Sequence, residues 1–297
     1  MNFKKTELEL LIKKIDYYKN PDIYKKLQLQ LNKYQIKNIE CKNLPKLTIN
    51  ERKHVNELFK NKDEKRLLSF LENKDPNSNI QIHEELPEFY HKNDMIISKS
   101  IIFNMLKLTK LLIKNNVNTL SYSYEIINSL AYNKNKEMID LVLTQSLDIN
   151  KKSIENFCPI NQAIKNDNIY LLKKLIKLGL NINNSDFQKM YPIHNVKSKE
   201  ALTLLLKNNA LINVKNQHGD SPLVYHTRMI SCNNVQKTKE IIVCLIENNA
   251  DLNIKNKWGY SFIDYFENYQ KPDKWFVEKH QMRNLPIYKE IKQMNLF

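Results

Sequence analysis

The sequence repeats one short pattern along its second half. Three stretches, at 175–183, 205–213 and 245–253, each run from apolar residues through a largely polar pair and a turn residue to an exit of the form x-apolar-Asn. Internal periods of about 20 to 50 residues are typical of arrays in which each unit packs only against its neighbours. The sequence therefore predicts a repeat array, which can extend to 297 residues without a single central core.

A second motif, centred on a proline, precedes each of these stretches. It reads Cys158-Pro159-Ile160, then Tyr191-Pro192-Ile193-His194, then Ser221-Pro222-Leu223. Proline suits the first turn of a helix, where its missing N–H has no partner to lose. We therefore expect a helix to start at each proline. The Ser221 hydroxyl can cap its helix, whereas Cys158 and Tyr191 predict weaker starts.

The two motifs in this order resemble the ankyrin repeat, whose period is near 33 residues. The spans from proline to exit asparagine are 24, 21 and 31 residues, so the second repeat is three residues short and the third is about seven too long. The resemblance implies an all-α solenoid of about five to six repeats with helical caps at both ends. It also implies that His194 bonds to neighbouring backbone. The Lys- and Asn-rich composition is similar to that of arrays from large DNA viruses and intracellular bacteria, which engage host proteins.

The residue that closes each second helix is predicted to adopt a left-handed conformation, which glycine tolerates best. The chain has only three glycines, and asparagine is the next most tolerant residue. The predicted positions, spaced by 30, 33, 30 and 40 residues, are Asn116, Ser146, Gly179, Asn209 and Asn249.

The pattern divides the chain into four segments. Residues 1–44 are predicted to form an N-terminal helical cap, with a docking hairpin or a basic membrane-surface helix as the alternatives. Residues 45–104 form a degenerate region in which Glu64 to Leu71 is a second helix, and 105–268 form the repeat array. Residues 269–297 are expected to be a C-terminal helical cap, and 76–94 are the best linker.

Enzyme chemistry is not expected. Three glycines cannot build a Gly-rich phosphate loop or a dinucleotide fingerprint. The seven histidines form no His-Glu-x-x-His motif. His83 and His91 lie near three glutamates, but their spacing matches no ligand set, so a solvated acidic stretch is the preferred interpretation. We predict no catalytic residue, no metal site and no cofactor.

Charge and cysteines limit the partner and the compartment. The net charge of +15 attracts nucleic acid or anionic membrane. Only four of the 47 basic residues are arginine, the residue that base readout favours, so nucleic acid is an unlikely main partner. The four cysteines show no zinc spacing. With neither a signal peptide nor a transmembrane segment apparent, we expect an intracellular monomer, delivered into or expressed in a host cell.

The expected function is non-catalytic protein recognition through the hairpin tips and inner helices. Trp258 is the strongest candidate, since an exposed tryptophan beside Lys257 and Tyr260 has the composition of an interface hot spot. The alternative is that Trp258 folds back against Phe262 or Trp275. The predicted partner-binding residues are Phe187, Gln188, Met190, Gln217, His218, Asp220, Arg228, Lys257, Trp258 and Tyr260.

Two alternative functions follow from the C-terminal segment and from the net charge. The segment Leu285-Pro286-Ile287-Tyr288-Lys289-Glu290-Ile291 resembles the opening of an F-box, which would make the chain a substrate adaptor to a ubiquitin ligase. Only six residues follow Ile291, however, and a short closing helix also fits. The remaining alternative is a basic nucleic-acid-binding protein, whose affinity would fall steeply with salt.

Overall fold

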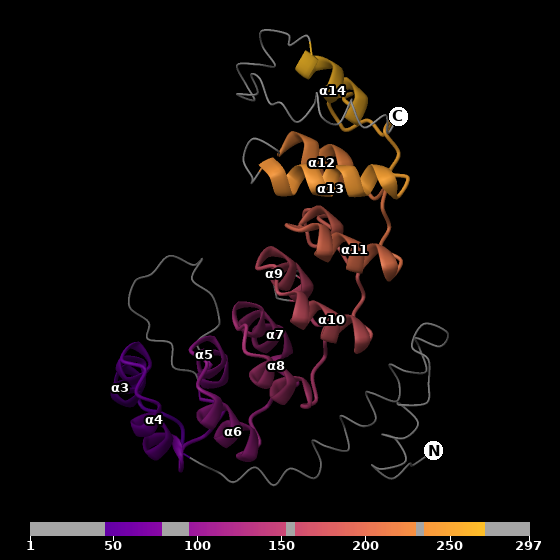
Figure 1. Cartoon of the computed structure of the whole chain (residues 1–297). Helices are drawn as coiled ribbons and strands as arrows, with labels where there is room; N and C mark the ends of the chain where they lie inside the picture. Colours follow the sequence, from indigo (N-terminus) through magenta and orange to yellow (C-terminus); the bar gives the residue numbers. More distant parts are fainter. Residues whose placement is uncertain (1–44, 79–94, 153–157, 230–234, 271–297) are drawn as a thin grey trace. The chain divides into compact units, whose positions relative to one another are not determined.

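The computed structural model describes residues 45–78, 95–152, 158–229 and 235–270 (Figure 1). These residues form twelve α-helices and one 3-10 helix, with no strand among them, which confirms an all-α fold. The predicted N-terminal cap at 1–44, all but the first two residues of the predicted C-terminal cap at 269–297, the F-box-like segment, and His83 and His91 lie outside the described residues.

The chain separates into two compact units. The first comprises Met1–Ser129 with Asn135–Asp148, and the second comprises Leu130–Lys134 with Ile149–Phe297. Residues 130–134 belong to the second unit because the Asn168 side chain donates to the carbonyls of Leu130 and Asn133, at 3.2 and 2.8 Å.

The first unit is built from helix pairs. Thr48 caps the first helix, and Glu64 to Leu71 is helical as predicted. The sequence boundary at 104/105 falls between two helices, α5 and α6, that pack against each other. The helices of this unit are α3 (Ile49–Lys60), α4 (Glu64–Leu71), α5 (Ile96–Ile102), α6 (Leu106–Lys114), the start of α7 (Ser123–Tyr132) and α8 (Lys136–Leu143).

In the second unit two series of helices run side by side. The first elements of each pair contact one another in the order α9, η1, α12, α14, and the second elements do so in the order α10, α11, α13. The buried faces are rich in leucine. Leu171, Leu172 and Leu175 of the second series are fully buried together, because residues at this spacing share one side of a helix. The elements are α9 (Pro159–Lys165), α10 (Ile169–Lys177), η1 (Pro192–His194), α11 (Lys199–Lys207), α12 (Pro222–Arg228), α13 (Val235–Glu247) and α14 (Phe262–Gln270).

The first helices start where the prolines predict. Pro159, Pro192 and Pro222 are the first residues of α9, η1 and α12. The Ser221 hydroxyl accepts a hydrogen bond from the backbone N–H of Val224 at 3.3 Å, whereas Cys158 makes no side-chain cap. The three-residue deletion falls in the first helix: η1 has three residues where α9 and α12 each have seven.

The second helices end as predicted at four of five positions. Asn116, Gly179, Asn209 and Asn249 have φ of +59, +89, +67 and +62°. At Asn209 the N–H donates to the Leu206 carbonyl and the next N–H to that of Leu205, as in a Schellman motif. The prediction for Ser146 is wrong, since it has no positive φ. Serine lacks the tolerance of asparagine for this conformation.

The extra residues of the third repeat are partly helical. α13 begins at Val235 and has 13 residues, against nine in both α10 and α11. Four extra residues add about one helical turn. Residues 230–234 lie outside the described part of the chain.

Candidate functional site

Three hairpin loops of the second unit share one internal bonding pattern. Asp186, Asn216 and Asn256 open these loops, and each side-chain oxygen accepts the backbone N–H groups of the residues two and four positions later. The six distances lie between 2.8 and 3.1 Å. The loops 186–190, 216–220 and 256–260 are therefore rigid and alike.

Backbone hydrogen bonds join each loop to the next. The N–H of Gln217 donates to the Gln188 carbonyl at 2.9 Å, and that of Lys257 donates to the His218 carbonyl at 2.9 Å. Gly219 lies at this junction with φ of +77°, and a Cβ there would lie 3.0 Å from the Lys257 nitrogen. Glycine is thus required both by conformation and by the close approach of the next loop.

Two predicted surface residues are buried inside this arrangement. Met190 is 8% exposed and Asp220 is 0% exposed. Each occupies the last position of its loop and accepts from the next loop: the Asn216 amide lies 3.5 Å from the Met190 sulfur, and the Asn256 amide lies 2.9 Å from Asp220 Oδ1. These two residues therefore hold the loops together. The expectation that they lie on the accessible surface is wrong, because the next loop buries them.

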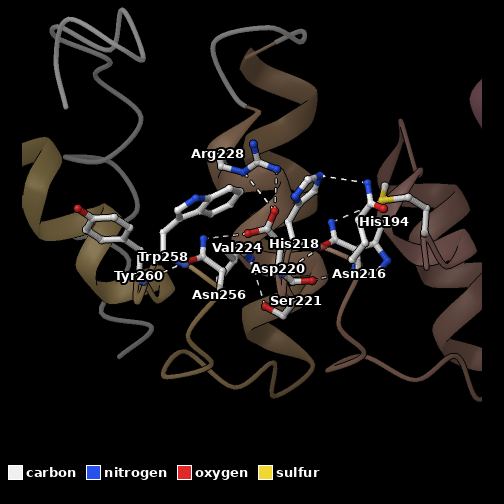
Figure 2. Close-up of polar contacts among 12 residues, drawn as sticks. His194, Asn216, His218, Asp220, Ser221, Val224, Arg228, Asn256, Trp258 and Tyr260 are labelled. Carbon is white, nitrogen blue, oxygen red and sulfur yellow. Dashed lines mark hydrogen bonds and ion pairs between the residues drawn. The ribbon is translucent and has the colours of Figure 1, made fainter. Parts of the chain in front are cut away.

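Arg228 neutralises the buried carboxylate of Asp220 (Figure 2). Its Nη2 and Nε donate to Asp220 Oδ2 at 2.7 and 3.2 Å, while Oδ1 accepts from Asn256. Both oxygens of the carboxylate are therefore satisfied, as a buried charge requires. Arg228 is the last residue of α12 and keeps part of its side chain exposed.

Trp258 lies on the surface beside this ion pair (Figure 2). Its ring stacks on His218 with centroids 5.5 Å apart and an 18° angle between planes, and the Arg228 guanidinium carbon lies 5.6 Å from the ring. The residue remains 53% exposed. Phe262 is fully buried and its ring pairs with Phe266, and Trp275 lies outside the described residues.

The other predicted contact residues divide by exposure. Phe187 is 55% exposed, and Gln188 and Lys257 are also exposed, whereas Gln217 and Tyr260 are half-buried. The Tyr260 ring packs against Tyr265 at 5.5 Å, within the last repeat. We call the remaining accessible set the tip surface: Phe187, Gln188, Gln217, His218, Arg228, Lys257 and Trp258.

Two buried histidines lie beneath the loops. The His194 Nδ1 accepts from the Tyr191 N–H at 3.2 Å, so its Nε2 carries the hydrogen and donates to the Asp220 carbonyl, also at 3.2 Å. The expected backbone bonding of His194 is thus present. His226 Nε2 donates to the Ile193 carbonyl at 3.4 Å. Burial lowers the pKa of His194 and lowers that of His226 to about 4, so both are neutral at pH 7.

The sequence analysis did not single out three exposed lysines that lie in the hairpin loops or directly before them, Lys189, Lys215 and Lys255. Their positions could have been found from the sequence. Lys189 follows Asp186 by three residues, and Lys215 and Lys255 directly precede Asn216 and Asn256.

Within the described ranges, no three His, Cys, Asp or Glu side chains gather where they could hold a metal ion. No helix in that part of the chain is long and apolar enough to span a bilayer. The chain matches no protein-family model, and no curated protein shows a significant match to it.

Proposed function

We propose that the second unit is an ankyrin-like array that binds a protein partner through the tip surface, without catalysis. Three features support the ankyrin-like assignment: helix pairs starting at proline, left-handed helix ends, and hairpin loops joined by backbone bonds. Such arrays present continuous binding surfaces because each repeat adds a similar element beside the last.

The observation that carries the proposal is the exposed, immobilised ring of Trp258. Most tryptophans are largely buried, but this one leaves 53% of its surface in water. His218 and Arg228 hold the ring in place before any partner arrives. A fixed aromatic side chain costs little conformational entropy on binding, which is the property of a hot spot.

The test uses the full chain as bait in nuclease-treated cell lysate at low and high salt. We expect a small set of proteins to be retained at high salt and lost with Trp258→Ala. For a purified partner, this substitution should weaken affinity by about thirtyfold or more, corresponding to about 2 kcal/mol. Leu211→Ala is the matched control, since Leu211 is 55% exposed but lies outside the tip surface.

Two results would contradict the proposal. Retention that disappears with nuclease or with salt would assign the activity to the positive charge and to nucleic acid. Equal retention by Trp258→Ala and the parent chain would remove the tip surface from recognition. Circular dichroism keeps the test interpretable, because Trp258→Ala should lower stability by only about 1 kcal/mol or less.

A further inference from the structure

Charge is unevenly distributed over the second unit. Its described residues include four exposed carboxylates: Glu200, Glu240, Glu247 and Asp251. The first three lie on the second helices α11 and α13, and Asp251 follows α13 in the loop that ends it. Among the acids of this unit whose side chains the structure describes, the exposed ones are therefore confined to the second-helix side.

The hairpin loops carry the opposite charge. The exposed charged side chains in these loops or directly before them are Lys189, Lys215, Lys255 and Lys257. The two acids of these loops, Asp186 and Asp220, are 7% and 0% exposed. Asp186 holds two backbone N–H groups of its own loop, and Asp220 is paired with Arg228. Asp220 is therefore neutralised by its ion pair, and Asp186 offsets only one of the four lysines, so these loops keep an excess of positive charge.

The first helices beside these loops extend the positive surface. α9, η1 and α12 contain no acidic residue, and Lys165 of α9 is exposed. Asp264 is the acidic residue in the first turn of α14, the next helix of this series. Its Oδ2 accepts from both the N–H and the hydroxyl of Ser261, at 2.7 and 2.6 Å, and these bonds lower its pKa. The Asp264 carboxylate therefore caps the start of α14.

We propose that the tip surface binds an acidic protein segment that carries an aromatic or aliphatic anchor residue. The anchor packs on Trp258, and Phe187 is the other large apolar side chain exposed in the loops. Carboxylates of the segment pair with Lys257 of the tip surface and with Lys189 and Lys255 beside it. Complementary charge of this kind steers association and selects against basic partners. The inference rests on the proposed function and adds the chemistry of the partner.

A protein segment fits this surface better than a nucleic acid does. Nucleic-acid sites of this type combine basic side chains with free aromatic faces on which bases stack. His218 covers one face of the Trp258 ring, with ring centroids 5.5 Å apart, which leaves a single face for a partner. Arg228, the one arginine of the surface, is held by Asp220 and has no free fork for a phosphate.

The first arm of the test selects short random peptides displayed on phage against the full-length protein. We expect the enriched peptides to be net negative and to contain a conserved aromatic or aliphatic position. Enrichment should disappear when Trp258→Ala protein is the target and persist with Leu211→Ala. An enriched pool that is neutral or basic would overturn the acidic partner, and so would no enrichment at all.

The second arm measures affinity by fluorescence anisotropy, with one enriched peptide and a single-stranded oligothymidylate as probes. Lys257→Glu should weaken peptide binding about fivefold. Lys207→Glu is the matched control, because Lys207 is exposed at the end of α11, on the second-helix side. Equal effects of the two substitutions would overturn the proposal, as would oligothymidylate binding more tightly than the peptide.

The outcomes separate this inference from the function it rests on. Neutral or basic peptides that depend on Trp258 would refute the acidic partner and leave protein recognition by the tip surface standing. Acidic peptides that bind equally well to Trp258→Ala would refute both.

Discussion

At the scale of single residues, one buried carboxylate connects three segments. Asp220 lies in the second loop, accepts from Arg228 at the end of α12, and accepts from Asn256 at the start of the third loop. Asn256 also donates to the Tyr265 hydroxyl at 3.2 Å, which extends the network into α14. A charge with no exposed surface is tolerated here because every oxygen has a partner.

Removing Arg228 should therefore cost more than a surface ion pair does. Arg228→Ala leaves the Asp220 carboxylate buried beside a single amide donor, and we expect a loss of about 2 kcal/mol in the free energy of unfolding. Asp220→Asn keeps the shape of the side chain and removes its charge. In this background, Arg228→Ala should lower the free energy of unfolding by much less. Urea unfolding of the two single variants and the double variant measures this coupling, and additive losses would contradict it.

At the scale of elements, asparagines at the helix ends connect successive repeats. The side-chain oxygens of Asn150, Asn183 and Asn213 each accept one backbone N–H of the following repeat, at 2.7, 2.9 and 3.0 Å. These are the exit residues of the x-apolar-Asn pattern. The recurrence of asparagine thus has two causes, the left-handed turn and the bond to the next repeat.

A pair of neighbouring asparagines tests the left-handed turn. Asn209 has φ of +67°, so Asn209→Gly should raise the free energy of unfolding by about 0.5 kcal/mol, since glycine adopts this conformation without strain. Asn208 has φ of −109° and donates to the Leu204 carbonyl at 2.8 Å. Asn208→Gly should therefore destabilise the protein. Thermal melts compare the two, and a gain at both positions would refute the explanation.

At the scale of the whole molecule, two buried histidines make stability depend on pH. His226 is 3% exposed and His194 is 0% exposed. Each is neutral in the fold and uses its ring to bind backbone of a neighbouring segment. Protonation would place a cation in the core without a carboxylate partner for His226, and the nearby His194 adds to that cost.

The sign of the pH effect follows from the two pKa values of His226. The unfolded chain takes a proton near pH 6.5, while the folded chain does so only near pH 4. Between these values the unfolded state binds more protons, so stability is complete above pH 6.5 and falls as the pH is lowered toward 4. The loss from His226 is on the order of 3 kcal/mol. His226→Gln should flatten the profile of urea midpoint against pH, and an unchanged slope would refute this assignment.

Local signals in the sequence predicted where most helices start and end. Proline at the first turn and asparagine after the last are constraints on one or two backbone angles, so they act without tertiary contacts. For this reason the helices starting at Pro159 and Pro222 and the ends at Asn209 and Asn249 agree with the structure. Ser146 shows the limit of the pattern, because position in a repeat does not overcome a residue's own conformational preference.

The amino-acid sequence by itself determined the helical class, the repeat positions and the exposed Trp258 as the leading candidate. Only the tertiary structure decided which neighbours of Trp258 are accessible. Met190 and Asp220 are buried by side chains 26 and 36 residues away, Asn216 and Asn256. Burial of a loop residue depends on the next loop packed against it, and no local pattern encodes that contact. The positive charge around the tip surface depends on the tertiary structure for the same reason. Asp186 and Asp220 are buried in loop contacts, whereas the neighbouring lysines remain exposed.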